Sequence, residues 1–342
     1  MPEEQSSRSR YKARTAAPNI RHALICCPAV AMLAACGSQP PSAMPYTSAP
    51  AAHAASRTSR MLAEAKSEDL LYVADGVGGN LFIYSYPRGD EMAEVMGLGE
   101  PEGTCVDKAQ DVFVVMSDSG RVNEYRHGET KPFARLQDAS GGPPLGCSVS
   151  PTTGDLAVTN ESGPYEGSSN YGPPNITIYK AARGKPKIYS DTSVGVMWFC
   201  AYDDKGNLFV DATDDSNNTV LVELPSGGST LTTIPLEQQS INPGGVQWDG
   251  QYVDVADRTG LSGNAVIYQF AIKHGKGVVA GSTVLANDQY VISFWIQGRK
   301  LIAGNPGDRT VQFWNYPAGG QATETLTGFY NPAAMAISLA PK

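Results

Sequence analysis

Apolar and polar residues alternate in short runs along the chain from residue 70 onward, and each run ends at a turn-forming residue. Alternation with a period of two is typical of a β-strand with one buried face, and Gly, Asn, Asp and Ser after a run indicate a turn. The runs of this first kind occupy residues 70–75, 111–116, 155–160, 207–212, 252–257 and 301–305. The sequence therefore predicts six equivalent strands separated by similar stretches of chain.

Three further segments accompany each of these strands. A second apolar run follows the turn, as in NLFIYSYP (80–87) and TVQFWNYP (310–317), and a third short strand follows the second, as in EMAEVM (91–96). A fourth segment, often opened by Pro and Gly, precedes the next first strand. The fourth segments occupy residues 101–107, 144–150, 197–203, 243–249, 292–297 and 332–338.

This four-part pattern predicts an all-β fold, a six-bladed β-propeller of four-stranded antiparallel blades. Equivalent first strands are 41 to 52 residues apart, which is the period of propeller repeats. A β-sandwich would also contain short strands and turns, but it would not repeat one pattern at a near-constant period. Because the pattern begins with a first strand and ends with a fourth segment, we expect one blade to pair N- and C-terminal strands and so close the ring.

The N-terminal segment, residues 1–35, has the features of a targeting signal. Five basic residues precede an apolar stretch from Ala23 to Leu33, which is too short to span a bilayer as a helix of ~20 residues. The stretch ends in Leu33-Ala34-Ala35-Cys36-Gly37, which resembles the lipobox of bacterial lipoproteins. That resemblance implies lipid on Cys36 and an extracytoplasmic protein anchored to the cell membrane or the outer membrane. An ordinary secretory signal with an incidental Cys is the alternative.

Composition extends this picture to the rest of the chain. Residues 36–67 are rich in Ser, Pro and Ala without periodicity, which predicts a flexible tether, and residues 68–342 then form the propeller. The whole chain has a net charge of −8, and without residues 1–35 it has 21 basic and 32 acidic residues. An acidic surface repels phosphates, so we expect no nucleic-acid partner.

Two sequence segments resemble the signature of known protein families. PEGTCVDKAQDVFVV (101–115) and DDKGNLFVDA (203–212) resemble the signature of NHL-type and SMP-30/gluconolactonase-like six-bladed propellers. The second of these families implies a divalent cation in the channel, held by a Glu near the domain start together with Asn and Asp residues. Glu102-Gly103 stands at the position of its Glu-Gly-Pro, but Thr104 replaces the Pro.

Candidate metal ligands occur at the ends of the first strands. Asp75, Asn160, Asp257 and Asn305 end their strands, and we take Glu102, Asn160, Asp257 and Asn305 as a candidate site for a divalent cation such as calcium. Asx side chains also bond to the backbone two residues on and initiate turns. Because the residue type recurs from blade to blade, we expect it to serve the turn first.

Three cysteines lie in fourth segments of the pattern: Cys105, Cys147 and Cys200. Aligned by the repeat, Cys147 and Cys200 share a register and Cys105 falls one residue later, so alternation predicts that Cys105 faces the other way. A metal trio is then excluded, and a Cys147–Cys200 disulfide depends on whether their Cα atoms lie within ~7 Å. The alternative is that all three are small buried apolar residues.

Function is less determined than fold. The longest insertion, residues 161–174, carries Tyr165 and Tyr171 and is a candidate contact loop. No nucleophile motif of the G-x-S-x-G kind is present. We therefore expect a membrane-tethered binding or scaffold module for an envelope protein or a small ligand, without catalysis. The alternative is a divalent-metal-dependent lactonase or hydrolase acting around Glu102.

Overall fold

The computed structural model describes residues 61–138, 142–161, 173–240, 242–258 and 263–342, which fold as strands and two short 3₁₀ helices. The first sheet has the order β24 (Pro332–Ser338), β1 (Asp69–Asp75), β2 (Asn80–Tyr86), β3 (Glu91–Met96). The second has the order β4 (Pro101–Val106), β5 (Val112–Met116), β6 (Arg121–Tyr125), β7 (Ala134–Gln137). The third has the order β8 (Pro144–Val149), β9 (Leu156–Asn160), β10 (Asn175–Tyr179), β11 (Lys187–Ser190). The fourth has the order β12 (Val194–Tyr202), β13 (Leu208–Asp214), β14 (Thr219–Leu224), β15 (Thr232–Pro235).

The remaining strands form one eight-stranded sheet made of two antiparallel halves. One half has the order β16 (Pro243–Trp248), β17 (Val253–Asp257), β18 (Ala265–Lys273), β19 (Lys276–Leu285). The other has the order β20 (Phe294–Gln297), β21 (Lys300–Asn305), β22 (Thr310–Asn315), β23 (Gly319–Thr327). A single parallel pair, Leu285 with Gly320, joins β19 to β23.

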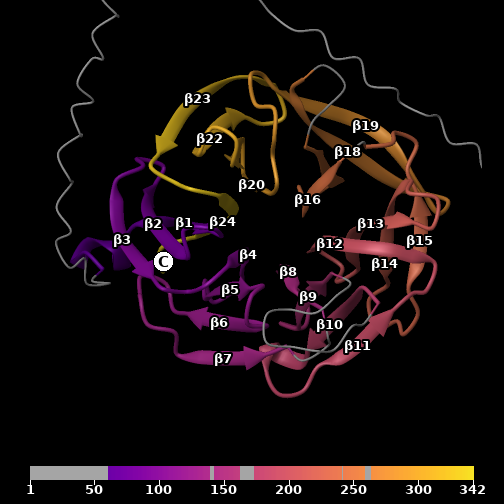
Figure 1. Ribbon diagram of the computed structural model, residues 1–342, viewed down its shortest axis with the longest axis horizontal. Helices are drawn as coiled ribbons and strands as arrows, with labels where there is room; N and C mark the ends of the chain where they lie inside the picture. The colour runs from indigo at the N-terminus through magenta and orange to yellow at the C-terminus, as the bar shows by residue number, and fades with distance from the viewer. Residues whose placement is uncertain (1–60, 139–141, 162–172, 241, 259–262) are drawn as a thin grey trace, which may run out of the picture. The chain divides into compact units, whose positions relative to one another are not determined.

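The prediction of an all-β chain of four-stranded antiparallel units is confirmed. Every predicted strand is present, and within each unit the fourth segment of the sequence pattern pairs with the first strand, as β4 does with β5 and β24 with β1. The strands from these fourth segments, β4, β8, β12, β16, β20 and β24, lie toward the centre of the view in Figure 1, and successive ones contact each other. These strands determine the position of the central cavity.

The apolar core lies between neighbouring sheets. Alternate residues of the strands face one neighbouring sheet or the other, so that Val114 and Tyr72 share one cluster while Val115 and Val158 share another. The C-terminal strand β24 is buried along its whole length, with Met335 and Ile337 packed between the first sheet and β21 and β22. Burial of apolar area in these layers stabilises the fold by ~25 cal/mol per Å².

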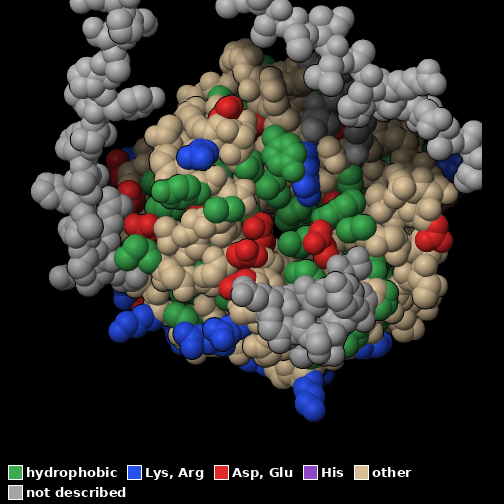
Figure 2. Space-filling view, in the orientation of Figure 1, with side chains coloured by type: hydrophobic (Ala, Val, Ile, Leu, Met, Phe, Trp, Pro, Cys, Tyr) green, Lys and Arg blue, Asp and Glu red, His purple; other side chains and the backbone are tan. Residues whose placement is uncertain are grey.

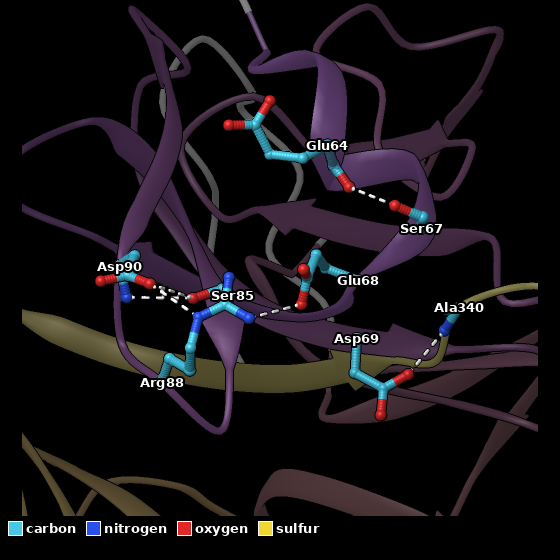
Figure 3. A network of polar contacts seen from close by, with 8 residues as sticks. All are labelled: Glu64, Ser67, Glu68, Asp69, Ser85, Arg88, Asp90 and Ala340. Carbon is cyan, nitrogen blue, oxygen red and sulfur yellow. Dashed lines mark hydrogen bonds and ion pairs between the residues drawn. The ribbon is translucent and has the colours of Figure 1, made fainter.

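The two ends of the described chain meet beside β1 (Figure 3). The Ala340 N–H donates to Asp69 Oδ1 over 2.7 Å, and Arg88 bridges Glu68 and Asp90 at 2.9 Å each. Ahead of β1, the 3₁₀ helix η1 (Ala63–Ser67) places Ala65 in the core, and the Leu62 N–H donates to Met92 O. Residues 61–67, predicted as the end of the tether, are therefore packed against the first sheet.

The orientation predicted for Cys105 is confirmed: Cys105 lies opposite Phe113, the third residue of its predicted strand, whereas Cys147 and Cys200 lie opposite the fourth residues of theirs. Because β4 and β8 belong to neighbouring sheets, these opposite faces bring Cys105 and Cys147 into one cluster, where they form a disulfide with their Cα atoms 5.7 Å apart. Cys200 is a buried free thiol. The candidate Cys147–Cys200 disulfide is wrong, because side chains on the same face of successive sheets do not face each other.

The described residues contain no helix that combines the length and the apolar character needed to cross a bilayer.

Candidate site at the mouth of the central cavity

A cavity of about 190 Å³ lies among the central strands. Its lining residues come from β4, β8, β12, β16, β20 and β24 and include Cys105, Cys147, Phe199, Trp248 and Trp295. Of the four tryptophans on strands, Trp314 is fully buried in the core, whereas Trp248 and Trp295 line this cavity. The wall is therefore built from aromatic and sulfur-bearing side chains together with small residues.

Charged side chains, which are not among the residues lining this cavity, gather where the central strands begin. The antiparallel pairing sets the beginning of each central strand opposite the end of the next strand, as Pro144 opposite Asn160 and Pro243 opposite Asp257. Glu161 and Arg258, which directly follow Asn160 and Asp257, therefore lie at the same end as Glu102, the second residue of β4. Figure 2 shows acidic and basic side chains close to the central hollow on this face, with hydrophobic groups around them. We call this end, defined by Glu102, Glu161 and Arg258, the mouth.

Glu102 is held in a restricted position at the mouth. A Cβ on Gly76 would lie 2.2 Å from Glu102 Oε1, so this carboxylate packs directly against the backbone at position 76. Burial together with the charges of Glu100, Glu161 and Asp75 raises the pKa of Glu102 to about 7, while Arg258 opposes them. Desolvation and like charges both favour the protonated acid, so the surroundings of Glu102 are poor in compensating cations.

Glu161 is positioned by its backbone and by Trp198. Its N–H donates to Pro143 O over 3.0 Å, and a Cβ on Gly142 would lie 1.8 Å from Glu161 O. Burial raises the pKa of Glu161, whereas Arg258 and a hydrogen bond with the Trp198 side chain lower it. The carboxylate is thus partly buried beside both a donor and a cation.

Arg258 reaches the mouth from the opposite side of the cavity. Its N–H donates to Asn242 O over 2.8 Å, and a Cβ on Gly244 would lie 3.1 Å from Arg258 Cγ. The guanidinium makes one long contact, from Nη1 to the Tyr290 hydroxyl at 3.5 Å, and its buried Nε has no partner among the described residues. A buried donor without an acceptor costs ~1–3 kcal/mol, so Arg258 has unused binding capacity.

Asp211 lies behind Arg258, on β13. Its side chain is fully buried; Oδ1 accepts the Phe199 N–H at 2.6 Å, and Oδ2 has no partner among the described residues. Burial raises the pKa of Asp211 to about 8, while the Phe199 N–H and Arg258 act in the opposite direction. The site therefore contains both an unpaired donor atom and an unpaired acceptor atom.

The Asp and Asn residues at the strand ends organise turns, as the repeat suggests. Asp75 accepts the N–H groups of Gly78, Tyr330 and Asn331 at 2.7 to 3.0 Å. Asn305 Oδ1 accepts the Asp308 N–H at 3.0 Å, while its Nδ2 donates to Asp288.

The other two predicted metal ligands at strand ends are also buried in their own sheets. Asn160 Nδ2 donates to Asn175 Oδ1 at 3.2 Å, and Asp257 is fully buried at the end of β17. Of the predicted set, Glu102 thus faces the mouth, and Asn305 is engaged through both atoms of its amide group. Asn160 is engaged through Nδ2, while its buried Oδ1 has no partner among the described residues. Binding of a divalent cation by Glu102, Asn160, Asp257 and Asn305 therefore remains a prediction.

A different acidic group lies at the opposite end of the central strands. Asp107, Asp111 and Glu124 bring their ligand atoms within 4.8 Å of one another. Glu124 forms an ion pair with Arg183, and the Asp111 N–H donates to Asp107 Oδ1 at 2.9 Å. Burial raises the pKa of Asp111 to about 6, with Asp107 and Glu124 adding to the effect and two arginines opposing it. Internal pairing accounts for this cluster.

The remaining predicted residues, Cys36, Tyr165 and Tyr171, lie outside the described residues. Two mouth residues, Arg258 and Glu161, were not predicted as functional residues. A signal for them was present in the sequence: the position after each strand-end Asp or Asn varies widely, as Gly76, Glu161, Arg258 and Pro306, while the Asp or Asn itself recurs.

Comparisons with known proteins show the fold. No family model matches the chain, and no curated protein matches it in sequence. A solved structure titled as a nidogen/laminin complex is similar with a TM-score of 0.61 and 14% identity, covering 80% of this chain and 99% of that one. A protein of unknown function from Bacteroides caccae gives a TM-score of 0.58 and 14% identity, covering 80% of this chain and 99% of that one. A functionally unknown protein from Desulfotomaculum acetoxidans gives 0.55 and 11%, covering 80% and 100%. The fold is therefore of the β-propeller type.

Proposed function

We propose that the chain is a lipid-anchored, extracytoplasmic six-bladed propeller that binds a small polar ligand at the mouth defined by Glu102, Glu161 and Arg258. The observation that carries the binding role is the mixed-charge mouth itself. Partly buried carboxylates and an arginine with an unpartnered Nε lie within electrostatic reach of one another where the central strands begin, which is typical of a ligand site.

The six-bladed architecture with a closed ring is supported by how the sheets pack. Counting the eight-stranded sheet as two blades gives six four-stranded units, since only Leu285 and Gly320 pair across its middle. Each neighbouring pair of units shares one apolar cluster, including the last and the first, where Ile302 and Phe313 pack with Val73 and Ile337. The first unit takes its central strand β24 from the C-terminus, which would close the ring.

The extracytoplasmic location is supported by two independent features. The segment Leu33 to Gly37 resembles a lipobox, which would place lipid on Cys36. The Cys105–Cys147 disulfide fits an oxidising compartment, because cytosolic thiols are kept reduced. Association through an NHL-type scaffold with an envelope protein is compatible with this location, and net acidic charge disfavours nucleic acid as a partner.

A divalent-metal lactonase of the gluconolactonase-like type is the second candidate, favoured by the carboxylates of Asp75, Glu100 and Glu161 near Glu102. The fit of a metal is poor in two respects. Asp75 already accepts three backbone N–H groups, and Arg258 brings a positive charge to the same place. Binding without metal chemistry is therefore the preferred function.

The ligand-binding role is tested on the mature chain carrying Cys36→Ser, so that the protein is free of lipid. Thermal unfolding is followed with zwitterionic, cationic, anionic and neutral polyol probes and with Ca²⁺, and hydrolysis of gluconolactone is assayed in parallel. We expect at least one organic probe to raise the melting temperature, and Arg258→Met to abolish the shift. Metal-dependent lactone hydrolysis would establish the second candidate, and the absence of any probe effect would overturn the mouth as a ligand site.

The anchor is tested separately by fractionation of cells that produce the full chain. Cys36→Ser should move the protein from the membrane to the soluble fraction, whereas Cys27→Ser, a matched change inside the signal segment, should not. Retention of Cys36→Ser in the membrane fraction at the level of the parent protein would contradict the lipid anchor.

A further inference from the structure

We propose that the mouth recognises the head group of a free α-amino acid, with the carboxylate on Arg258 and the ammonium group between Glu161 and Glu102. This inference rests on the proposed function of the mouth and names the class of ligand. It follows from which polar groups at the mouth are already occupied and which are not.

Two of the four carboxylates near the mouth are already engaged. Asp75 accepts three backbone N–H groups, and Glu100 is exposed and accepts the Ser117 hydroxyl at 3.3 Å. Glu161 is partly buried and interacts with Trp198, and the Glu102 carboxylate has no hydrogen bond to another described residue. Glu102 and Glu161 are therefore the carboxylates available to a ligand.

One cationic group faces these two acids, and it too is incompletely paired. Arg258 Nε is buried without an acceptor, and the single Nη1 contact to Tyr290 spans 3.5 Å, at the limit of a hydrogen bond. A carboxylate is the group that a guanidinium binds best, through two parallel N–H···O bonds. The charge of Arg258 also acts on the fully buried Asp211, whose Oδ2 has no partner among the described residues.

Charge balance excludes simpler ligands. An isolated anion on Arg258 would be repelled by Glu102 and Glu161, and an isolated cation between the acids would be repelled by Arg258. A compact molecule that carries both charges on neighbouring atoms satisfies all three side chains. An α-amino acid is the smallest molecule with that arrangement.

The cavity limits the size of a ligand side chain that enters it. Its volume is about 190 Å³, below the ~300 Å³ at which pockets for drug-sized ligands begin. Its lining combines apolar side chains such as Phe199, Val246 and Met335 with polar ones such as Thr104 and Ser148, and we take L-leucine as a first probe of suitable size.

The experiment compares three probes by calorimetric titration of the mature Cys36→Ser protein: L-leucine, isoamylamine, which lacks the carboxylate, and 4-methylpentanoate, which lacks the amine. We expect L-leucine to bind roughly ten- to a hundredfold more tightly than either analogue, the effect of losing one charge-assisted interaction. Arg258→Met should remove the preference for L-leucine over isoamylamine, and Glu161→Gln the preference over 4-methylpentanoate. Arg309→Met, which alters an arginine stacked on the exposed Tyr330, is the matched control and should leave all three affinities unchanged.

The outcomes separate this inference from the proposed function. Isoamylamine or 4-methylpentanoate binding as tightly as L-leucine to the parent protein overturns the amino-acid assignment but leaves a ligand-binding mouth. The same holds if none of the three binds while a polyol or Ca²⁺ does. If no probe of any class shifts the melting temperature, both proposals fail. Circular dichroism of each variant shows whether a lost affinity reflects a lost fold.

Discussion

The mouth and the wall of the central cavity are built on the same strands, yet their side chains differ in character. In the wall, the Cys105–Cys147 disulfide joins two central strands, and Phe199 and Trp248 cover the rest with apolar surface. At the mouth, only a few residues away, Arg258 Nε and Asp211 Oδ2 are buried without partners. Thr104 Oγ1 and Trp248 Nε1 in the wall also lack partners among the described residues, so the difference is one of charge: the wall is cross-linked and lined by uncharged side chains, whereas the mouth carries charged ones.

This difference teaches where to look for function in a repeated fold. A residue type that recurs in four of the six units serves the unit: Asp75 and Asn305 both close turns through backbone N–H groups three residues on. The very next position is not bound by the turn and holds Glu161 in one unit and Arg258 in another. We therefore expect changes to the wall and turns to alter stability, and changes to the mouth to alter binding.

The largest effect should follow deletion of residues 331–342, which removes β24. This strand is buried throughout and pairs with β1 from Leu70 to Asp75, so its loss exposes the cores on both sides. Because domains are stable by only ~5–15 kcal/mol and each buried Met or Ile contributes ~1.5–3, we expect no cooperative unfolding transition. Near-ultraviolet circular dichroism on heating measures this, and a truncated protein that melts like the full chain would refute ring closure by β24.

The second effect concerns the wall alone. Replacing both Cys105 and Cys147 by Ala opens a loop with a sequence separation of 42 residues and should lower the free energy of unfolding by roughly 4 kcal/mol. Urea denaturation under non-reducing conditions measures the loss, with Cys200→Ala as a control that removes a buried sulfur but no cross-link. Ligand affinity at the mouth should not change in folded protein. Equal stability of the double variant and the parent would show that the disulfide does not hold the wall.

The strand pattern was predictable because the alternation of apolar and polar residues and the turn residues are local properties, and both recur in each repeat. The pairing of Cys105 with Cys147 was not predicted, although their opposite registers were, because strand alternation alone does not show that opposite faces of neighbouring sheets meet. The mouth was only partly predictable: Glu102 was found through a family resemblance, whereas Arg258 acquires its role from blade packing that brings distant turns to one end of a cavity. The sequence signal for such a residue is that the position after the recurring strand-end Asp or Asn varies from unit to unit.

The third effect depends on pH and lies at the boundary between wall and mouth. Burial raises the pKa of Asp211 to about 8 from an ordinary value near 3.8, so the folded protein keeps a proton that the unfolded chain releases. Its contribution to stability is present at low pH and is lost as the pH rises toward 8, at up to ~1.4 kcal/mol per pH unit. Asp211→Asn should remove this slope while Asn Oδ1 still accepts the Phe199 N–H. Urea denaturation at pH 5, 6, 7 and 8 should show the variant gaining stability relative to the parent as the pH rises, and parallel curves would contradict the prediction.

The smallest expected effects compare the strand-end position of the repeat with the position directly after it. Asp75→Ala removes the acceptor of three backbone N–H groups and should cost ~1–3 kcal/mol of unfolding free energy. Glu161→Gln, one position further along in its own unit, keeps the shape of the side chain and should change stability by less than ~0.5 kcal/mol. Chemical denaturation of the two variants beside the parent protein measures both. If Glu161→Gln proved as destabilising as Asp75→Ala, the mouth carboxylate would belong to the scaffold, and the division between turn residues and ligand residues would have to be abandoned.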